Sequence, residues 1–275
     1  MFQLINENHK GIIEKFILEI GKVPIEKTAN AIENIIRKIH KDIPEKKRIS
    51  YGRYSIIKKM GLEIYPMLEE SGIDVYSFGK KIFDNTDNDQ FVRSFAIQLI
   101  SIYGEKTKNL DVVLADFENA ATDENWEMRE CSAGFIRKLI KKYPQELRQW
   151  YLKSEKSENE LLRRFTIESF RPVADNQWFK KNPDFCFEVL ENLYTESKEY
   201  PRTSVGNSLS DWFRTDKERV FEIIEKLVKS GNKNSYWIAY RACRNIVKTE
   251  TNRVMDLLGV DEYKYKKRVH FRMIE

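Results

Sequence analysis

Apolar and charged residues recur at helical spacing along most of the chain. In residues 9–40 an apolar residue returns every three or four positions, which predicts amphipathic helices. Pro24 interrupts this run, so we expect one helix on each side of it. Gly61 and Pro66 predict a further interruption, and residues 74–83 predict another short helix.

A longer repeat begins near residue 84. Each copy has a short polar turn, then an arginine, and three positions later a small or β-branched residue inside an apolar helix. The arginine position falls at Arg93, Arg129, Arg163, Arg202 and, in the last copy, Ala239, so successive copies begin 36, 34, 39 and 37 residues apart. A second helical segment follows each of the first four copies, in residues 109–121, 144–153, 183–195 and 217–230.

A period in the upper thirties built from two helices is typical of a HEAT-like solenoid, in which each pair buries one face against its neighbours. We therefore predict an all-α fold, a right-handed superhelical α-α solenoid that is C-shaped. The prediction is a single domain over residues 1–275. It comprises N-terminal helices in 1–83, recognisable repeats in 84–250 and a C-terminal cap in 251–275.

Composition supports a helical protein that lies outside membranes. Among 275 residues there are only 11 Gly and 7 Pro, few turn-formers for this length. The three cysteines lack CxxC spacing and predict buried thiols in a reducing compartment. The three histidines are too scattered for a zinc site. With no apolar run of membrane-spanning length and no signal-peptide layout, we expect a cytoplasmic monomer without metal or cofactor.

Charge is unevenly distributed, although the net charge is only +5. Residues 37–59 hold nine basic residues against Asp42 and Glu45, and residues 263–272 hold five basic residues and no acidic one. Such clusters favour a polyanionic partner, because neutralising phosphates releases counterions. The alternative is that lysine-rich helices are simply solvated.

The stretch 159–178 contains the most distinctive side chains. On a helix, Arg164, Glu168 and Arg171 fall at i, i+4 and i+7 and share one side. Pro172 is expected to end the helix just after Arg171. One carboxylate between two guanidinium groups suits a phosphate or a developing positive charge. A surface ion-pair ladder is the alternative.

Other arginines allow two interpretations. An arginine near the start of a repeat helix can pair with an acid of the adjacent repeat and hold the stack together. Adjacent arginines such as 163 and 164, however, diverge by about 100° on a helix and cannot serve one purpose. A row of arginines would instead form a groove that follows phosphates. Its candidate members are Arg163, Arg164, Arg171, Arg202, Arg241 and Arg244, with hydrogen bonds added by Ser204 and Asn207.

Tryptophans add a second candidate contact. A tryptophan in a groove can stack on a sugar or a base, whereas one between helices belongs to the core. Core packing is the simpler interpretation of Trp178 and Trp212. Trp126 is different, because Glu130 lies one turn later on the same face and a carboxylate has no role in an apolar seam.

Four segments resemble one protein family. They are Arg-Arg-x3-Glu-x2-Arg-Pro at 163–172, Ser-Val-x-Asn-x-Leu-x-Asp at 204–211, Trp-x3-Glu at 126–130, and Tyr-Trp-Ile with Arg-x2-Arg and Lys in 236–248. The chain resembles the HEAT-like-repeat DNA alkylpurine glycosylases of the AlkC/AlkD family. It is most similar to AlkC-type proteins without the C-terminal immunoglobulin-like domain. The resemblance covers roughly residues 84–250.

The resemblance implies hydrolysis of the N-glycosidic bond of cationic N3- or N7-alkylated purines in double-stranded DNA, without metal or cofactor. The matching positions imply Glu130, Glu168 and Asp211 as catalytic carboxylates. They imply Arg164 and Arg171 as residues that hold phosphate and orient the glutamate, and Trp126 and Trp178 as contacts to deoxyribose.

The chain also departs from the family pattern. Residues 173–177 delay Trp178, Asn207 stands where AlkD has a second stacking tryptophan, and Pro201 precedes Arg202. Two other functions therefore stay open. One is a non-catalytic solenoid that binds damaged or branched DNA, and the other is a protein-interaction scaffold.

Overall fold

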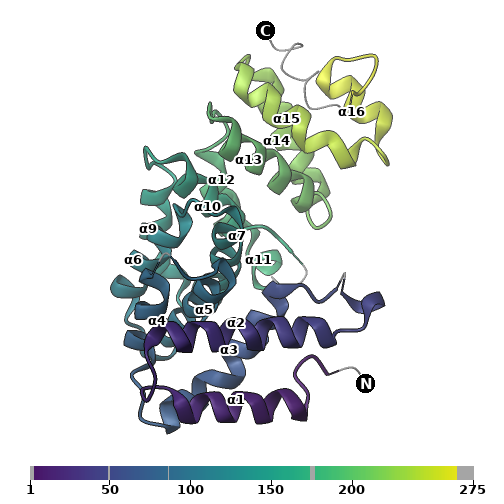
Figure 1. The fold of residues 1–275 in the computed structure, drawn as a ribbon. Helices are drawn as coiled ribbons and strands as arrows, with labels where there is room; N and C mark the ends of the chain where they lie inside the picture. Colours follow the sequence, from purple (N-terminus) through teal and green to yellow (C-terminus); the bar gives the residue numbers. More distant parts are fainter. Residues whose placement is uncertain (1–2, 49, 86, 174–176, 265–275) are drawn as a thin grey trace. The chain divides into compact units, whose positions relative to one another are not determined.

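The computed structural model describes residues 3–48, 50–85, 87–173 and 177–264. These residues form α-helices and one short 3-10 helix, with no β-strand among them, so the all-α prediction is confirmed (Figure 1). The chain divides into two compact units, Met1–Lys142 (unit 1) and Tyr143–Glu275 (unit 2). Each unit has its own core, and the single domain over 1–275 stays a prediction.

Unit 1 begins with the helices expected on either side of Pro24. The helix predicted at residues 74–83 is also present, and its first turn is capped by the side chain of Asp74, which accepts from the Ser77 amide. The elements are α1 (Glu7–Glu19), α2 (Ile25–Asp42), η1 (Glu45–Lys47), α3 (Arg53–Glu70), α4 (Val75–Asp84), α5 (Gln90–Thr107), α6 (Leu110–Ala121), α7 (Trp126–Phe135) and α8 (Arg137–Lys142).

The interruption predicted at Gly61 and Pro66 was wrong, because both residues lie inside the continuous helix α3. Gly61 serves packing rather than a turn: a Cβ atom there would lie 2.5 Å from Cγ of Gln98 in α5. Pro66 cannot donate to the carbonyl of Leu62, but Leu62 is exposed, so water can replace that bond.

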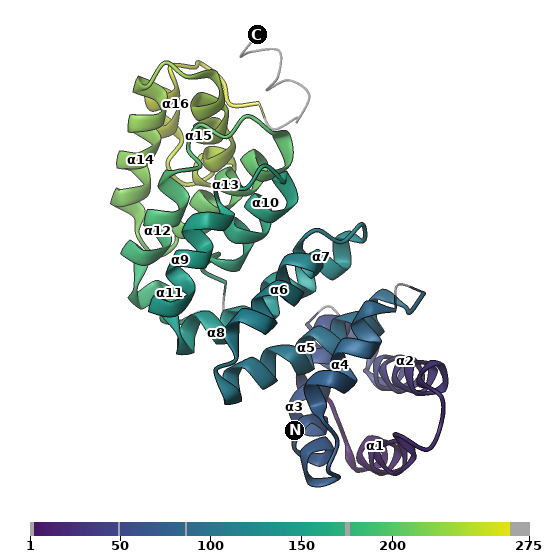
Figure 2. The same ribbon diagram turned by 90° about the vertical axis from the view of Figure 1, so that its left-hand side faces the viewer.

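Unit 2 contains two rows of helices. Figure 2 shows α9, α12 and α14 on one side of this unit and α10, α13 and α15 on the other. The elements are α9 (Pro144–Ser154), α10 (Glu160–Ser169), α11 (Gln177–Lys181), α12 (Pro183–Glu191), α13 (Glu199–Trp212), α14 (Lys217–Lys229), α15 (Lys233–Ile246) and α16 (Thr251–Leu258). The second helices predicted for the first four copies are therefore confirmed as α6, α9, α12 and α14.

The polar turn that opens a copy acts as a helix N-cap in four of the five copies. The side chains of Asp89, Asn125, Asn159 and Asn232 accept hydrogen bonds from backbone amides in the first turns of α5, α7, α10 and α15. Such caps satisfy amides that have no partner within the helix. The start of α13 differs, because Oε1 of Glu196 accepts from the Lys198 amide at 2.8 Å.

The repeated arginine joins consecutive copies in three cases. Arg93 pairs with Asp123 at 2.7 Å, Arg163 with Glu196 at 2.6 Å, and Nη1 of Arg202 donates to Oδ1 of Asn234 at 2.6 Å. Each acceptor lies at the turn or first helical turn of the next copy. The sequence pattern thus marks the connection between neighbouring helix pairs.

The cores bear out the predictions for cysteine and for most tryptophans. All three cysteines are buried free thiols. Trp212 is fully buried against Phe187, and Trp237 is buried as well. None of the helices in the described ranges combines the length and the apolar run that crossing a bilayer requires. Within the same ranges, no three His, Cys, Asp or Glu side chains are grouped so as to hold a metal ion.

Candidate functional site

The end of α10 positions the central carboxylate of unit 2. The helix ends at Ser169, two residues earlier than the sequence predicted. The reason is that a proline disfavours the helical conformation of the residue before it, so Arg171 leaves the helix ahead of Pro172. The Arg171 side chain nevertheless turns back onto Glu168, and Nη1 donates to Oε2 at 2.9 Å.

Glu168 is surrounded by donors on all sides. Its side chain is only 4% exposed. Oε1 accepts from the Ser204 hydroxyl at 2.6 Å and lies 3.5 Å from Nη2 of Arg164, while Oε2 accepts from Arg171. The structure therefore brings together the three side chains predicted to share one side of a helix, and adds a hydroxyl from α13.

The surrounding charges decide the ionisation of this group. Burial alone would raise the pKa of Glu168, but the guanidinium groups of Arg171 and Arg164 and the Ser204 hydroxyl lower it below its ordinary value. Burial likewise opposes the charge of Arg171, yet Glu168 and Asp211 raise the pKa of Arg171 on balance. The cluster is thus a buried, charged network rather than a neutral one.

Asp211 extends the network toward the surface. Nε and Nη2 of Arg171 both donate to Oδ2 of Asp211, at 2.9 and 2.5 Å. The Asp211 side chain is 19% exposed, against 4% for Glu168. Its other oxygen, Oδ1, makes no hydrogen bond within the described residues. Arg171 therefore connects the buried carboxylate of Glu168 to the more exposed carboxylate of Asp211, whose Oδ1 accepts no hydrogen bond from the described residues.

Sequence reasoning missed Tyr200, which positions Arg164. The guanidinium carbon of Arg164 lies 4.3 Å from the centre of the Tyr200 ring, a cation–π contact. Tyr200 precedes Ser204, Asn207 and Asp211 by four, seven and eleven residues, so all four lie on one side of α13. That spacing is the signal that could have identified it.

Helix α15 adds further positive charge beside α13. Its close approach requires Gly206, where a Cβ atom would lie 2.6 Å from Cγ of Arg241. Nε of Arg241 donates to Oδ1 of Asn207 at 3.0 Å, and burial and the nearby Arg244 lower the pKa of Arg241. We call this group of cations the cationic face; its members are Arg164, which is buried, Arg171, Arg241 and Arg244, which are half-buried, and Lys248, which is exposed.

Three other residues predicted to contact DNA make hydrogen bonds within the protein. Arg163 donates to Glu196, and Arg202 donates to Asn234 while its guanidinium lies 4.6 Å from the Trp237 ring centre. The Ser204 hydroxyl is directed to Glu168. These side chains join helices, and the adjacent Arg163 and Arg164 do serve different neighbours.

Trp178 lies in an aromatic cluster. It is half-buried in the short helix α11. Its ring makes edge contacts with Phe179 and Phe185, with ring centres 5.4 and 5.7 Å apart. The ring therefore packs against its own helix and the start of α12.

Trp126 and Glu130 lie in unit 1, on the wall of a hollow of about 440 Å³. Trp126 is 61% exposed, which distinguishes it from the buried Trp212 and Trp237. The other lining residues are His40, Gly52, Arg53, Tyr54, Phe91, Glu127 and Cys131. Because Glu130 and Glu168 belong to different units, their convergence on one site stays a prediction.

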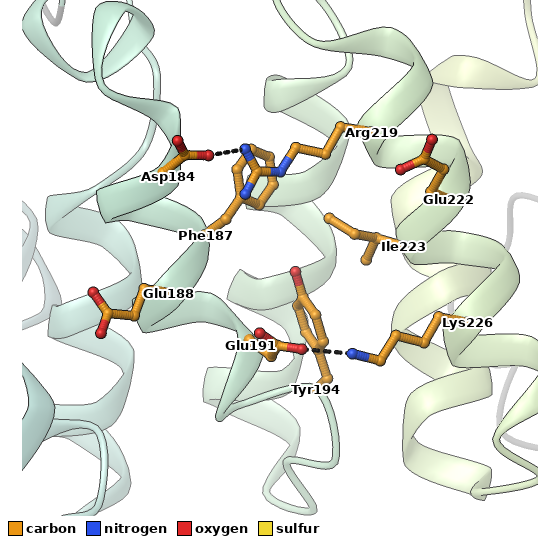
Figure 3. Close-up of a pocket in the computed structure, with 9 residues that line it drawn as sticks. All are labelled: Asp184, Phe187, Glu188, Glu191, Tyr194, Arg219, Glu222, Ile223 and Lys226. Carbon is orange, nitrogen blue, oxygen red and sulfur yellow. Dashed lines mark hydrogen bonds and ion pairs between the residues drawn. The ribbon is translucent and has the colours of Figure 1, made fainter.

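The opposite row of unit 2 carries a hollow of about 390 Å³ between α12 and α14, shown in Figure 3. Its charges are paired across the two helices: Arg219 with Asp184, and Lys226 with Glu191, both at 2.5 Å. Arg219 also lies 4.2 Å from the Phe187 ring centre. These pairs are solvent-exposed and join neighbouring helices.

Comparisons with known proteins address the family and the fold. A family model described as DNA alkylation repair enzyme matches residues 92–246, more than half of the chain. The alkylpurine DNA glycosylase AlkC of Pseudomonas fluorescens, solved bound to DNA containing an abasic site analogue, is 19% identical. The match has a TM-score of 0.55 and covers 93% of this chain and 67% of that chain. AlkD2 of Streptococcus mutans is also 19% identical, with a TM-score of 0.53. That match covers 84% of this chain and 99% of AlkD2. At this identity the structural likeness concerns the fold. A comparison with curated proteins gave no match.

Proposed function

Because the chain belongs to the DNA alkylation repair enzyme family, we propose that it is a DNA glycosylase for alkylated purines. The reaction is hydrolysis of the N-glycosidic bond of cationic N3- or N7-alkylpurines in duplex DNA. The similar fold of AlkC, an alkylpurine DNA glycosylase solved with DNA, supports the substrate class. The observation that carries the proposal is the Glu168–Arg171–Asp211 network of unit 2.

The chemistry of this reaction suits fixed carboxylates. A cationic alkylpurine is already a good leaving group, so the barrier falls when positive charge that develops on the sugar is stabilised. A carboxylate can provide that stabilisation and also orient the attacking water. Its charge must be present before the substrate binds, and the surroundings of Glu168 favour the ionised form.

The geometry supports a division of roles between the two carboxylates. Glu168 is enclosed by Arg164, Arg171 and Ser204, so we assign it the positioning of Arg171. Asp211 is more exposed and keeps Oδ1 without a hydrogen bond in the described chain, so we assign it the contact to water or sugar. Glu130 in unit 1 remains a third candidate.

The cationic face supports DNA as the partner. Arg164 and Arg171 contact Glu168, and Arg171 also contacts Asp211, while Arg241, Arg244 and Lys248 add positive charge on α15 and just after it. Arginine suits phosphate recognition because its planar fork can donate two parallel hydrogen bonds. Binding through this face should weaken steeply with salt, since each phosphate contact releases counterions.

The test is release of methylated bases from methylated duplex DNA. Wild-type protein is expected to release 3-methyladenine or 7-methylguanine, and Asp211→Asn is expected to reduce release about a hundredfold or more. Asp211→Asn preserves an oxygen for Arg171, so duplex affinity should change less than twofold. Glu188→Gln on α12 is the matched control and should release base at the wild-type rate.

A second candidate function is a non-catalytic protein that binds damaged or branched DNA. The enclosure of Glu168 favours it, because a carboxylate with a 4% exposed side chain does not reach a sugar without rearrangement. Salt-sensitive binding without base release, at protein in excess over methylated sites, would establish this alternative and contradict the glycosylase. Absence of both binding and release would contradict both.

A further inference from the structure

The N-terminal helices form one wall of the hollow that holds Trp126. His40 lies in the last turn of α2, Gly52 is the N-cap of α3, and Arg53 and Tyr54 begin α3. Residues 41–53 contain η1 and five of the nine basic residues of the cluster in 37–59. The family model matches only residues 92–246 and so leaves this part of the chain without an assigned role.

Three exposed cations of this segment have no acidic partner. Within the described residues, the side chains of Lys41, Lys46 and Arg53 make no hydrogen bond and no ion pair. Cations on either side of them do. Arg37 pairs with Glu33, Lys38 with Asp42 and Lys59 with Glu63, each one helical turn apart.

Contacts among the described residues hold Arg53 and the end of α2 in place. The guanidinium carbon of Arg53 lies 4.3 Å from the centre of the Phe91 ring, which is itself part of the hollow. Such stacking fixes the plane of the guanidinium and leaves its N–H edges available. Arg48 ties the turn to the end of α2, since its Nε and Nη2 donate to the carbonyls of Ile43 and Lys41.

Positive charge also acts on His40 at this side of the hollow. The pKa of His40 is lowered, first by burial and then by the positive charges of Arg53 and Arg48. Acidic groups of the hollow, Glu127 and Glu130, lie on the other helix, α7, and Glu127 accepts a hydrogen bond from Gln90. The α2–α3 side of the hollow is therefore a site that favours an added anion.

We propose that Lys41, Lys46 and Arg53 form a binding surface for the DNA backbone, on which Arg53 holds the phosphate next to the nucleotide that contacts Trp126. This inference rests on the proposed function, since it presumes that duplex DNA is the partner. A phosphodiester fits the site because it supplies the missing negative charge. The exposed indole beside it provides a flat apolar surface for a sugar or a base.

The test measures duplex affinity across a salt series for three proteins: wild type, a Lys41→Gln/Lys46→Gln/Arg53→Gln variant, and a matched control. The control, Arg37→Gln/Lys38→Gln/Lys59→Gln, removes the same charge from paired cations of the same unit. The first variant is expected to lose about two to three units of the slope of log affinity against log salt, and the control to keep it within about one unit.

A second measurement addresses the neighbouring indole. If Arg53 and Trp126 hold adjacent groups of one strand, Arg53→Gln and Trp126→Ala should be non-additive in a double-mutant cycle for duplex binding. Additive losses would overturn the specific role of Arg53. Melting temperatures of both variants should match the wild type, since both side chains are exposed.

The outcomes separate this inference from the proposed function. If the wild type does not bind duplex DNA, the proposed function fails and the inference fails with it. If the wild type binds and both triple variants lose the same slope, only net charge matters and the inference alone is overturned. Binding of vesicles of equal phosphatidylserine and phosphatidylcholine, abolished by the first variant while duplex affinity is unchanged, would also overturn it in favour of a lipid surface.

Discussion

Two buried carboxyl groups of unit 2 have opposite surroundings. Glu168, between α10 and α13, contacts two guanidinium groups and a hydroxyl, and despite its burial its pKa is lowered. Glu155, just after α9, accepts only from Nδ2 of Asn192 at 2.6 Å, and its Oε2 has no hydrogen bond within the described residues. Burial raises the pKa of Glu155 to about 7.

The comparison shows that burial alone does not determine the charge state of a carboxyl group. Both residues are almost inaccessible, at 3% and 2% exposure. Only Glu168 has cations at i−4 and i+3, which keep it charged and connect it to Asp211. Glu155 is closer to a neutral acid that fills space between helices.

The largest expected effect is on stability when Glu168 is removed. Glu168→Ala leaves Arg164 and Arg171 partly buried with one counter-charge fewer, and should lower the free energy of unfolding by about 3–5 kcal/mol. Glu155→Gln keeps an acceptor for Asn192 and should change it by less than about 1 kcal/mol. Urea unfolding at pH 5, where Glu155 is neutral and Glu168 is charged, measures both, and equal losses would remove the distinction between the two groups.

The second prediction concerns pH. The pKa of Glu155 is about 7 in the folded protein against about 4.5 in an unperturbed carboxyl, so the folded state binds more protons between these values. The stability that the neutral Glu155 carboxyl group contributes is therefore fully present below pH 4.5 and is lost as the pH rises through 7. Relative to Glu155→Gln, the wild type should lose about 3 kcal/mol between pH 4.5 and 8, at about 1.4 kcal/mol per pKa unit.

Glu168 should respond in the opposite direction. Its pKa is lowered on folding, so its contribution to stability is complete above the ordinary pKa and is lost as pH falls below it. The same unfolding series on Glu168→Gln tests this. A wild-type advantage that grows as pH falls would contradict the assigned charge state.

A third prediction concerns the packing of α13, which contacts Glu168, and leaves the surroundings of Glu155 unchanged. Gly206→Ala places a methyl group against Arg241 and the carbonyl of Ile238, where α13 and α15 meet. The helices must separate, which should lower the free energy of unfolding by about 1–3 kcal/mol and disturb the Arg241–Asn207 bond. Gly11→Ala, where a Cβ meets no neighbour, is the control and should be neutral or stabilising.

The smallest effect is expected in the row that contains α12. Asp184→Asn breaks the pair with Arg219, but Asp184 is 89% exposed and Arg219 retains its stacking on Phe187. An exposed ion pair contributes about 0–1 kcal/mol, and salt screens it. Thermal unfolding in low and high salt measures the change. A loss above 2 kcal/mol would show that this row is held by its charges.

Features encoded locally were predictable from the sequence. Helix periodicity, the polar caps and the repeated arginine require only nearby residues, and so do Arg164 and Glu168, which are one turn apart. The connection from Arg171 to Asp211 crosses 40 residues, and spacing within one helix does not reveal it. Only the family resemblance had nominated Asp211.

The sequence analysis gave a wrong interpretation of Gly61 and missed Tyr200 because the role of each depends on a residue distant in the sequence. The sequence predicts a break at Gly61 because glycine weakens a helix, whereas this glycine leaves space for the Gln98 side chain of another helix. Tyr200 was overlooked because an aromatic residue at helical spacing usually belongs to the core. Its role depends on Arg164, which comes from the preceding copy.

The arginines that fasten one copy to the next recur at a fixed place, while the Arg164–Glu168–Arg171 combination stands in a single copy. Inserting another helix pair would therefore lengthen the array and bring its own connecting arginine, but no second copy of this charged network. The residues that connect the repeats differ from those that form the network, so the number of repeats can change without duplicating the network.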